Sequence, residues 1–171
     1  MRKRMKVVRW LSILTVLTLP HCSFSELQQI SASDAISTNL CELAEHPQQF
    51  SGKLVSVLAT VTGKDILIDD FDGAPCSAYL MIVAVYPDAV KPPPGFEFQH
   101  DDSSAFFDKE VRTGKNVEAT FIGRFDVSYV WQNHVRVKVG KERGYGPKDQ
   151  YGARIVLHRI ANVTSRPRPR K

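Results

Sequence analysis

Cys41 to Gly63 reads CELAEHPQQFSGKLVSVLATVTG, and this stretch decides the fold. In its second half the side chains alternate, with Val55, Val57, Ala59 and Val61 on one face, Ser56, Thr60 and Thr62 on the other, and Leu58 as an apolar exception. Alternation with a period of two predicts a half-buried β-strand at residues 53–63. The first half predicts a short helix, because Asn39 can cap its N-terminus with Glu42 three residues on, and Pro47 ends it.

Further strands are predicted downstream. The stretches are 66–68, 77–86, 116–125, 135–139 and 153–163. Residues 77–86 (SAYLMIVAVY) form the most apolar run after the first 25 residues and predict a central strand buried on both faces. In the last strand the apolar face changes between Leu157 and His158, which predicts a β-bulge. A short helix is predicted at 104–113, where Gly114 ends it.

The order of these elements predicts the fold class. It is mainly β: a small OB-like antiparallel barrel of five to six strands, with an N-terminal helix and a short helix between strands three and four. We assign this single domain to residues 37–164. The phrases HPQQFSGKLVSVLATVTG, VEATFIGRF and GYG followed by QYGARIVLHRI resemble small OB-fold modules of uncharacterised exported proteins and lipoproteins of bacteria. The resemblance implies the same fold and assigns no catalytic residue.

The first 25 residues predict a signal peptide. Five basic residues precede or flank Trp10–Leu19, an apolar run too short for the roughly 20 residues that span a bilayer. Small residues in the sequence SFS favour cleavage before Glu26, which would release a periplasmic or secreted protein. Alternatively, LPHC resembles a lipoprotein box, and lipidation of Cys22 would anchor the chain to a membrane. A buried core helix is a third interpretation, against which the charged flank and terminal position argue.

The charge balance argues against nucleic acid as a partner. The chain has 23 Lys+Arg and 18 Asp+Glu, and removing the first 25 residues, with five basic and no acidic side chains, leaves 18 against 18. Nucleic-acid binding needs a basic face that displaces counterions from phosphates. Residues 26–36 are interpreted as a leader. The tail 165–171 (SRPRPRK) alternates Arg and Pro, which predicts a disordered, extended basic segment.

Cysteine usage predicts one disulfide. Removal of the signal leaves Cys41 and Cys76, and an even count in an exported protein favours a bridge. In the chain-entropy model such a bridge stabilises the fold by roughly 3–4 kcal/mol. The spacing is not C-x-x-C, so a redox-active pair is not predicted.

Aromatic residues are the candidate ligand-binding side chains. They are Tyr129, Trp131, Tyr145 and Tyr151. These residues lie in or beside the late strands and the glycine-rich loop 141–152 (KERGYGPKDQYG). At least Tyr129 and Trp131 share a strand face, and an exposed aromatic strip would bind a sugar chain, a peptide or another protein. The alternative is that these rings only cover the core. The predicted function is therefore an exported, non-enzymatic binding module of OB type with an unknown ligand.

A metal-dependent enzyme or metal-binding protein is the second functional hypothesis. His100, Asp101 and Asp102 offer ligand types that suit several divalent ions. Ligands that are adjacent in sequence seldom converge on one ion, so we expect no metal and no other cofactor. The sequence contains no GxSxG, HExxH or P-loop motif, and it assigns no catalytic residue.

Overall fold

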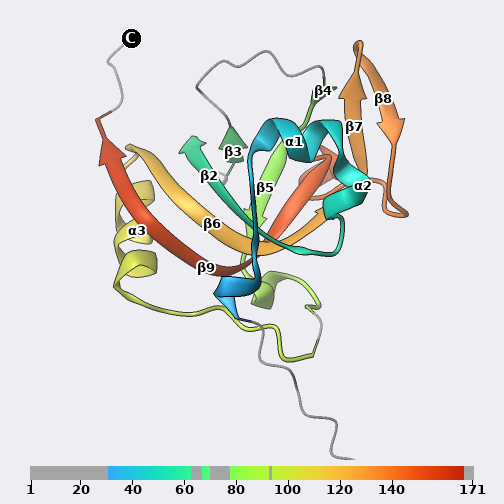
Figure 1. Cartoon of the computed structure of the whole chain (residues 1–171). Helices are drawn as coiled ribbons and strands as arrows, with labels where there is room; N and C mark the ends of the chain where they lie inside the picture. Colours follow the sequence, from blue (N-terminus) through green and yellow to red (C-terminus); the bar gives the residue numbers. More distant parts are fainter. Residues whose placement is uncertain (1–30, 63–66, 70–77, 93, 168–171) are drawn as a thin grey trace, which may run out of the picture.

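The computed structural model describes residues 31–62, 67–69, 78–92 and 94–167, and this part of the chain is mainly β (Figure 1). In chain order its elements are η1 (Ala32–Asp34), β1 (Ile36–Thr38), α1 (Leu40–Glu45), α2 (Pro47–Phe50), β2 (Leu54–Thr62), β3 (Leu67–Asp69), β4 (Ala78–Tyr79), β5 (Ile82–Val85), η2 (Pro87–Ala89), α3 (Asp102–Arg112), β6 (Asn116–Val127), β7 (Tyr129–Gln132), β8 (Val135–Lys138), η3 (Pro147–Asp149) and β9 (Ala153–Arg166). The signal peptide, Cys22 and residues 168–171 of the basic tail lie outside the described residues, so those interpretations stay predictions. The predicted disordered tail begins too early, because Ser165 and Arg166 belong to β9 and pair with β6.

The main sheet is mixed. Its six strands follow the order β1-β2-β3-β5-β9-β6, and β6 also pairs with β2. The β1–β2 and β5–β9 pairs are parallel, whereas the others are antiparallel. Strands β4, β7 and β8 form a separate three-stranded sheet. The predicted antiparallel barrel of five to six strands is therefore wrong. Alternation in a sequence reports which face of a strand is buried, and it reports neither the pairing partner nor its direction.

The core lies between the inward faces of β2, β6 and β9. Val55 and Val57 of β2 are fully buried, and Leu58 is 60% exposed, as the sequence pattern predicts. Val57 lies opposite Phe121 of β6, which is also fully buried. The long β6 and β9 strands curve together around this core, and α3 lies beside them (Figure 1).

The predicted bulge in the last strand is confirmed. Ile122 of β6 lies opposite Arg159, and the next residue, Gly123, lies opposite Leu157. His158 is therefore the extra residue of β9 in this stretch. A bulge bends its strand and increases the local twist, and here it also turns the His158 side chain into a buried position.

The predicted start of the first helix is confirmed. Asn39 caps α1 as expected, because its Oδ1 accepts a hydrogen bond from the Glu42 amide at 2.8 Å. The helix ends at Glu45, and Pro47 then begins α2 as well as ending the first pattern. Proline favours a first helical position because its missing N–H has no helical partner there.

Helix α3 begins two residues before the predicted start. Asp101 caps it, with Oδ1 accepting from the Ser104 amide at 3.0 Å while Ser104 Oγ accepts from the Asp101 amide at 3.0 Å. This reciprocal pair is a capping box. Phe107 is fully buried and meets Phe121 edge to face, with ring centroids 5.6 Å apart. The helix is thus anchored to β6 by its apolar face.

Three local predictions are corrected. The run 77–86 is two strands, β4 and β5, which belong to different sheets. The parallel strand β1 was not predicted. In β8, Val135 is 62% and Val137 37% exposed, so its valine face does not line the core. The predicted disulfide partner Cys76 lies outside the described residues, and Cys41 lies in α1.

Candidate ligand-binding pocket

Two of the four predicted aromatic ligand residues are buried. Tyr129 is 3% and Tyr151 6% exposed. The Tyr129 hydroxyl donates to the carbonyls of Asp149 at 3.1 Å and Gln150 at 2.8 Å, which fixes the loop before β9. Burial raises the pKa of Tyr129, so its hydroxyl stays a donor at neutral pH. These two rings cover the core instead of offering an open stacking face.

The other two are half-buried. Trp131 meets Tyr129 edge to face, with centroids 6.1 Å apart. Tyr145 forms an isolated bridge with Tyr151, and the Arg154 guanidinium lies 4.7 Å from the Tyr145 ring centroid. Burial, more than the nearby charges, raises the pKa of Tyr145 to about 12. Trp131 and Tyr145 are therefore each tied to one of the two buried tyrosines, Trp131 by a ring contact with Tyr129 and Tyr145 by backbone pairing with Tyr151.

The His100–Asp102 segment is divided among different tasks. Asp101 caps α3, and its second carboxylate oxygen accepts from Arg159 Nε at 3.3 Å. His100 points toward Phe98, with ring centroids 4.8 Å apart. Within the described residues, no group of three or more His, Cys, Asp or Glu side chains is placed to hold a metal ion.

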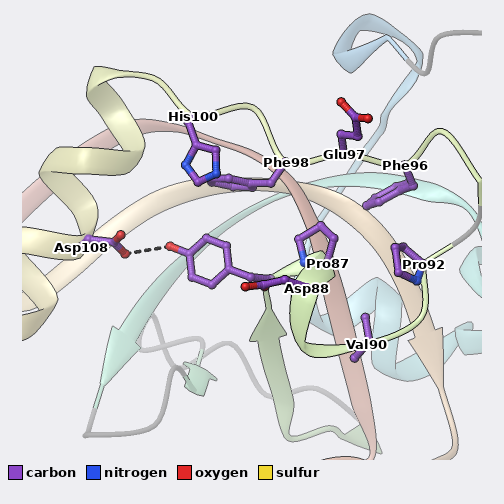
Figure 2. A pocket seen from close by; sticks show the side chains of 10 residues that line it. Pro87, Asp88, Val90, Pro92, Phe96, Glu97, Phe98, His100 and Asp108 are labelled. Atoms are coloured by element: carbon purple, nitrogen blue, oxygen red, sulfur yellow. Dashed lines mark hydrogen bonds between the residues drawn. The ribbon is translucent and has the colours of Figure 1, made fainter.

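A cavity of about 610 Å³ lies beyond the end of β5. Its lining residues are Tyr86, Pro87, Asp88, Val90, Pro92, Phe96, Glu97, Phe98, His100 and Asp108 (Figure 2). This volume falls in the range of about 300–1,000 Å³ that is typical of ligand pockets. The lining comes from η2, from the segment before α3 and from α3 itself, three stretches that the fold brings together.

The segment before α3 is held against β9. The Gln99 amide donates to the His158 carbonyl at 2.7 Å, and His158 Nδ1 lies 2.7 Å from the Glu97 carbonyl oxygen. A carbonyl can only accept, so Nδ1 carries the proton. The Phe96 ring packs against the same imidazole, with centroids 5.7 Å apart. The bulge residue of β9 thus positions one wall of the pocket.

Aromatic rings form a second wall. Tyr86 and Phe98 meet edge to face with centroids 4.9 Å apart, and Phe98 and His100 meet edge to face with centroids 4.8 Å apart. Figure 2 shows Phe98 and His100 along one side of the cavity, with Asp108 at the end nearest α3 and Pro92 and Val90 at the other end. Edge-to-face pairs favour fixed ring positions, so this wall is preorganised.

One hydrogen bond closes the α3 end of the pocket. The Tyr86 hydroxyl donates to Asp108 Oδ1 at 2.7 Å. Burial raises the pKa of Tyr86, the hydrogen bond to Asp108 raises it further, and the charge of Arg112 opposes both. The phenol therefore stays protonated across the physiological range and keeps Asp108 in place.

The pocket lining is acidic. Three of its residues are acidic, namely Asp88, Glu97 and Asp108, and the residues that the structure places in the lining include neither Lys nor Arg. Figure 2 shows the Glu97 carboxylate directed away from the Phe96 and Phe98 rings. Arg112, one helical turn after Asp108, is near enough to act on the pKa of Tyr86. The cavity thus combines aromatic surface with negative charge, which is the combination that attracts an organic cation.

No family model, curated protein or solved structure matches the chain, so the pocket is interpreted from its geometry. Within the described residues, no helix is long and apolar enough to cross a membrane. Sequence reasoning placed the ligand residues at 129–151 and missed this pocket. The available signal was Phe96 and Phe98, which flank Glu97 and follow a run of prolines, between the predicted strand 77–86 and the predicted helix 104–113.

Proposed function

We propose that the protein is an exported, non-enzymatic binding module. The cavity lined by Tyr86 and Phe98, from here on the acidic pocket, binds basic, proline-containing peptide segments. The observation that carries the proposal is the pairing of three acidic residues with aromatic rings in the lining of one cavity of about 610 Å³. A ligand that fits must bring positive charge and a compact apolar surface. An arginine followed by proline supplies both.

The aromatic wall supports a peptide ligand. Proline-rich segments adopt an extended polyproline II conformation at low entropic cost and dock on aromatic-lined grooves. A guanidinium over an aromatic face gains about 0.5–2 kcal/mol, depending on desolvation. The partly exposed rings of Tyr86 and Phe98 offer such surfaces in a lining that also includes Asp88 and Glu97.

The charge distribution favours a cationic peptide over a neutral saccharide. Sugar hydroxyls need donors and acceptors that are still available, but the Tyr86 hydroxyl is already donated to Asp108. Asp88 and Glu97 are exposed residues of the lining, and Figure 2 shows the Glu97 carboxylate on the opposite side of its segment from the Phe96 and Phe98 rings. Each carboxylate is an acceptor that a guanidinium fork matches with two parallel hydrogen bonds.

The test is isothermal titration of the mature protein with the synthetic peptide SRPRPRK, the sequence of residues 165–171. We expect measurable binding that weakens with salt, because paired surface charges are screened. The double variant Asp88→Asn/Glu97→Gln should bind at least about tenfold more weakly, which corresponds to about 1.4 kcal/mol. Glu118→Gln, a carboxylate of β6 outside the pocket, is the matched control and should bind as wild type.

Two outcomes would contradict the proposal. One is no binding of the peptide up to millimolar concentration; the other is equal affinity in the double variant and in the Glu118→Gln control. Zinc titration addresses the hypothesis of a metal-binding protein. If the wild-type protein binds stoichiometric zinc but not the peptide, and His100→Ala does not bind zinc, a metal site replaces the peptide proposal.

A further inference from the structure

A second hollow, the basic cleft, lies between the β7–β8 hairpin and the loop before β9. Its volume is about 340 Å³, and its lining residues are Ser128, Tyr129, Arg136, Lys138, Glu142, Arg143, Lys148 and Asp149. None of these residues lines the acidic pocket described above. The basic cleft is thus a separate feature of opposite charge.

Cations outnumber carboxylates in the basic cleft. Arg136 and Lys138 come from β8, and Arg143 and Lys148 come from the loop, against the carboxylates of Glu142 and Asp149. The excess is two positive charges at neutral pH. All four cationic residues are exposed, so their charged groups stay hydrated and can exchange water for a ligand.

The floor of the basic cleft is rigid. The Arg136 guanidinium carbon lies 3.6 Å from the centroid of the buried Tyr129 ring, and Arg136 also donates to the Arg143 carbonyl. Ser128 Oγ donates to the Glu142 carbonyl at 2.6 Å. These contacts join the hairpin to the loop, so the two segments that carry the cations are held side by side.

The loop also holds an unusual backbone conformation. Lys148 and Asp149 have φ angles of 55° and 56°, in the left-handed region that non-glycine residues seldom adopt. The Tyr129 hydroxyl donates a hydrogen bond to the Asp149 carbonyl, which holds the backbone of the loop in this conformation. A Cβ on Gly144 would lie 2.5 Å from that same carbonyl oxygen, so only glycine fits. Backbone strain held this way occurs preferentially at ligand clamps, and here it sets Lys148 at the cleft wall.

We propose that the basic cleft binds the phosphoryl group of a phosphorylated ligand. The excess of two positive charges matches a phosphate dianion, and arginine forks such as that of Arg143 match phosphate oxygens in pairs. Tyr129 supplies an apolar floor beside the anion. This inference does not depend on the peptide-binding proposal, because no residue is shared between the two sites.

The experiment titrates the mature protein with inorganic phosphate and with glucose 6-phosphate, followed by NMR shifts of the loop amides. We expect saturable binding, weakened about tenfold or more in Lys138→Gln/Lys148→Gln, because two charge-assisted contacts are lost. Lys109→Gln on α3 is the matched control and should bind as wild type. Circular dichroism checks that both variants fold. Asp88→Asn/Glu97→Gln should also keep wild-type phosphate affinity.

A second arm identifies the source of the phosphoryl group. Sedimentation with phosphatidylglycerol–phosphatidylcholine vesicles, compared with pure phosphatidylcholine vesicles, tests a lipid headgroup. Binding to the anionic vesicles that is lost in Lys138→Gln/Lys148→Gln supports the cleft with a lipid as source, and binding to glucose 6-phosphate alone supports it with a soluble source. No binding by either arm, or equal binding in the Lys109→Gln control and the double variant, overturns the inference.

Discussion

The Tyr86 hydroxyl donates to Asp108 Oδ1 at 2.7 Å, which joins two residues that lie 22 positions apart. This bond connects the end of β5 to the middle of α3 and closes one end of the acidic pocket. The same two groups therefore contribute to stability and to the shape of the binding site, and substitutions at Tyr86 can separate the two contributions.

Tyr86→Phe removes the hydrogen bond and keeps the ring. We expect the free energy of unfolding to fall by about 1 kcal/mol, the usual net value of one such bond. Affinity for the SRPRPRK peptide should stay within about threefold of wild type, because the aromatic face remains. Tyr86→Ala should lose stability and affinity together. Urea unfolding and peptide titration measure the two, and unchanged affinity in Tyr86→Ala would remove the ring from the binding site.

Gly123 of β6 lies against the β9 backbone with no room for a side chain. A Cβ at this position would lie 2.3 Å from the Val156 carbonyl oxygen and 2.6 Å from Ile155 Cγ2. We predict that Gly123→Ala lowers the free energy of unfolding by about 1–3 kcal/mol, because the β6–β9 ladder must move apart. Chemical denaturation measures the loss.

Gly114 gives a control for a different mechanism. Its φ is +74°, and an added Cβ would meet nothing within 4 Å. Gly114→Ala should therefore cost about 1–2 kcal/mol from the left-handed backbone alone. Removing the clashing Cγ2 atom should matter only in the first variant. The loss from Ile155→Ala and the loss from Gly123→Ala should add to less than their sum in the double variant, because alanine lacks the Cγ2 atom that the new Cβ meets, whereas the losses from Ile155→Ala and Gly114→Ala should add fully. Full additivity in both double variants would contradict the steric explanation.

Glu110 predicts a pH dependence of stability. Its Oε2 accepts from Lys115 Nζ and from Ser165 Oγ, each at 2.6 Å. These hydrogen bonds, that of Lys115 first, hold the pKa of Glu110 below its ordinary 4.5. A carboxyl whose pKa is lowered by folding stabilises the fold fully above its unfolded-state pKa, and the contribution disappears as pH falls through the folded-state value.

The measurement is the difference in unfolding free energy between wild type and Glu110→Gln from neutral pH down to about pH 3. We expect Glu110→Gln to be less stable at neutral pH and the difference to shrink below about pH 4.5. Glu118→Gln, the same substitution on β6, is measured in parallel as the matched control. A difference that stays constant with pH would show that the ionised Glu110 carboxylate contributes nothing.

The sequence periodicity predicted the strands that have one buried face. It did not predict which strands pair or whether they run parallel. The alternation in β2 and β6 identified their buried residues correctly, since one face of each packs on the core. It could not show that β5 runs parallel to β9, because that pairing joins residues such as Ile82 and Ala153, far apart in sequence. The short β1 has only Ile36 as a strongly apolar residue, and it forms through its parallel pairing with β2.

The candidate site was harder to predict than the core. A continuous apolar run such as 77–86 does not show that the chain changes sheets between Tyr79 and Ile82. The acidic pocket forms from three segments whose side chains follow no common period, so only the folded chain brings them together. The sequence prediction selected residues 129–151 because four aromatic residues lie close together there. Two of these residues, Tyr129 and Tyr151, are buried and cover the core.

The Cys41–Cys76 disulfide remains a prediction that the arrangement of elements supports. Helix α1, which carries Cys41, packs against β4, and β4 begins at Ala78, two residues after Cys76. We expect thiol labelling of the exported, denatured protein to find no free thiol before reduction and two after it. Cys41→Ser should lower the free energy of unfolding by about 3 kcal/mol in the chain-entropy model.

The same sample tests how the chain is processed, because the mass of the intact protein depends on the cleavage site. Cleavage before Glu26 removes Cys22 and leaves two cysteines, whereas the lipoprotein route keeps Cys22 as a lipidated first residue and adds the mass of its acyl chains. Cys22→Ser is the control: it should leave the first route unchanged and should release the protein from membranes in the second. The periplasm is an oxidising compartment that preserves a disulfide. Protein recovered from the periplasm with two labelled thiols per chain before reduction would therefore contradict the Cys41–Cys76 bond.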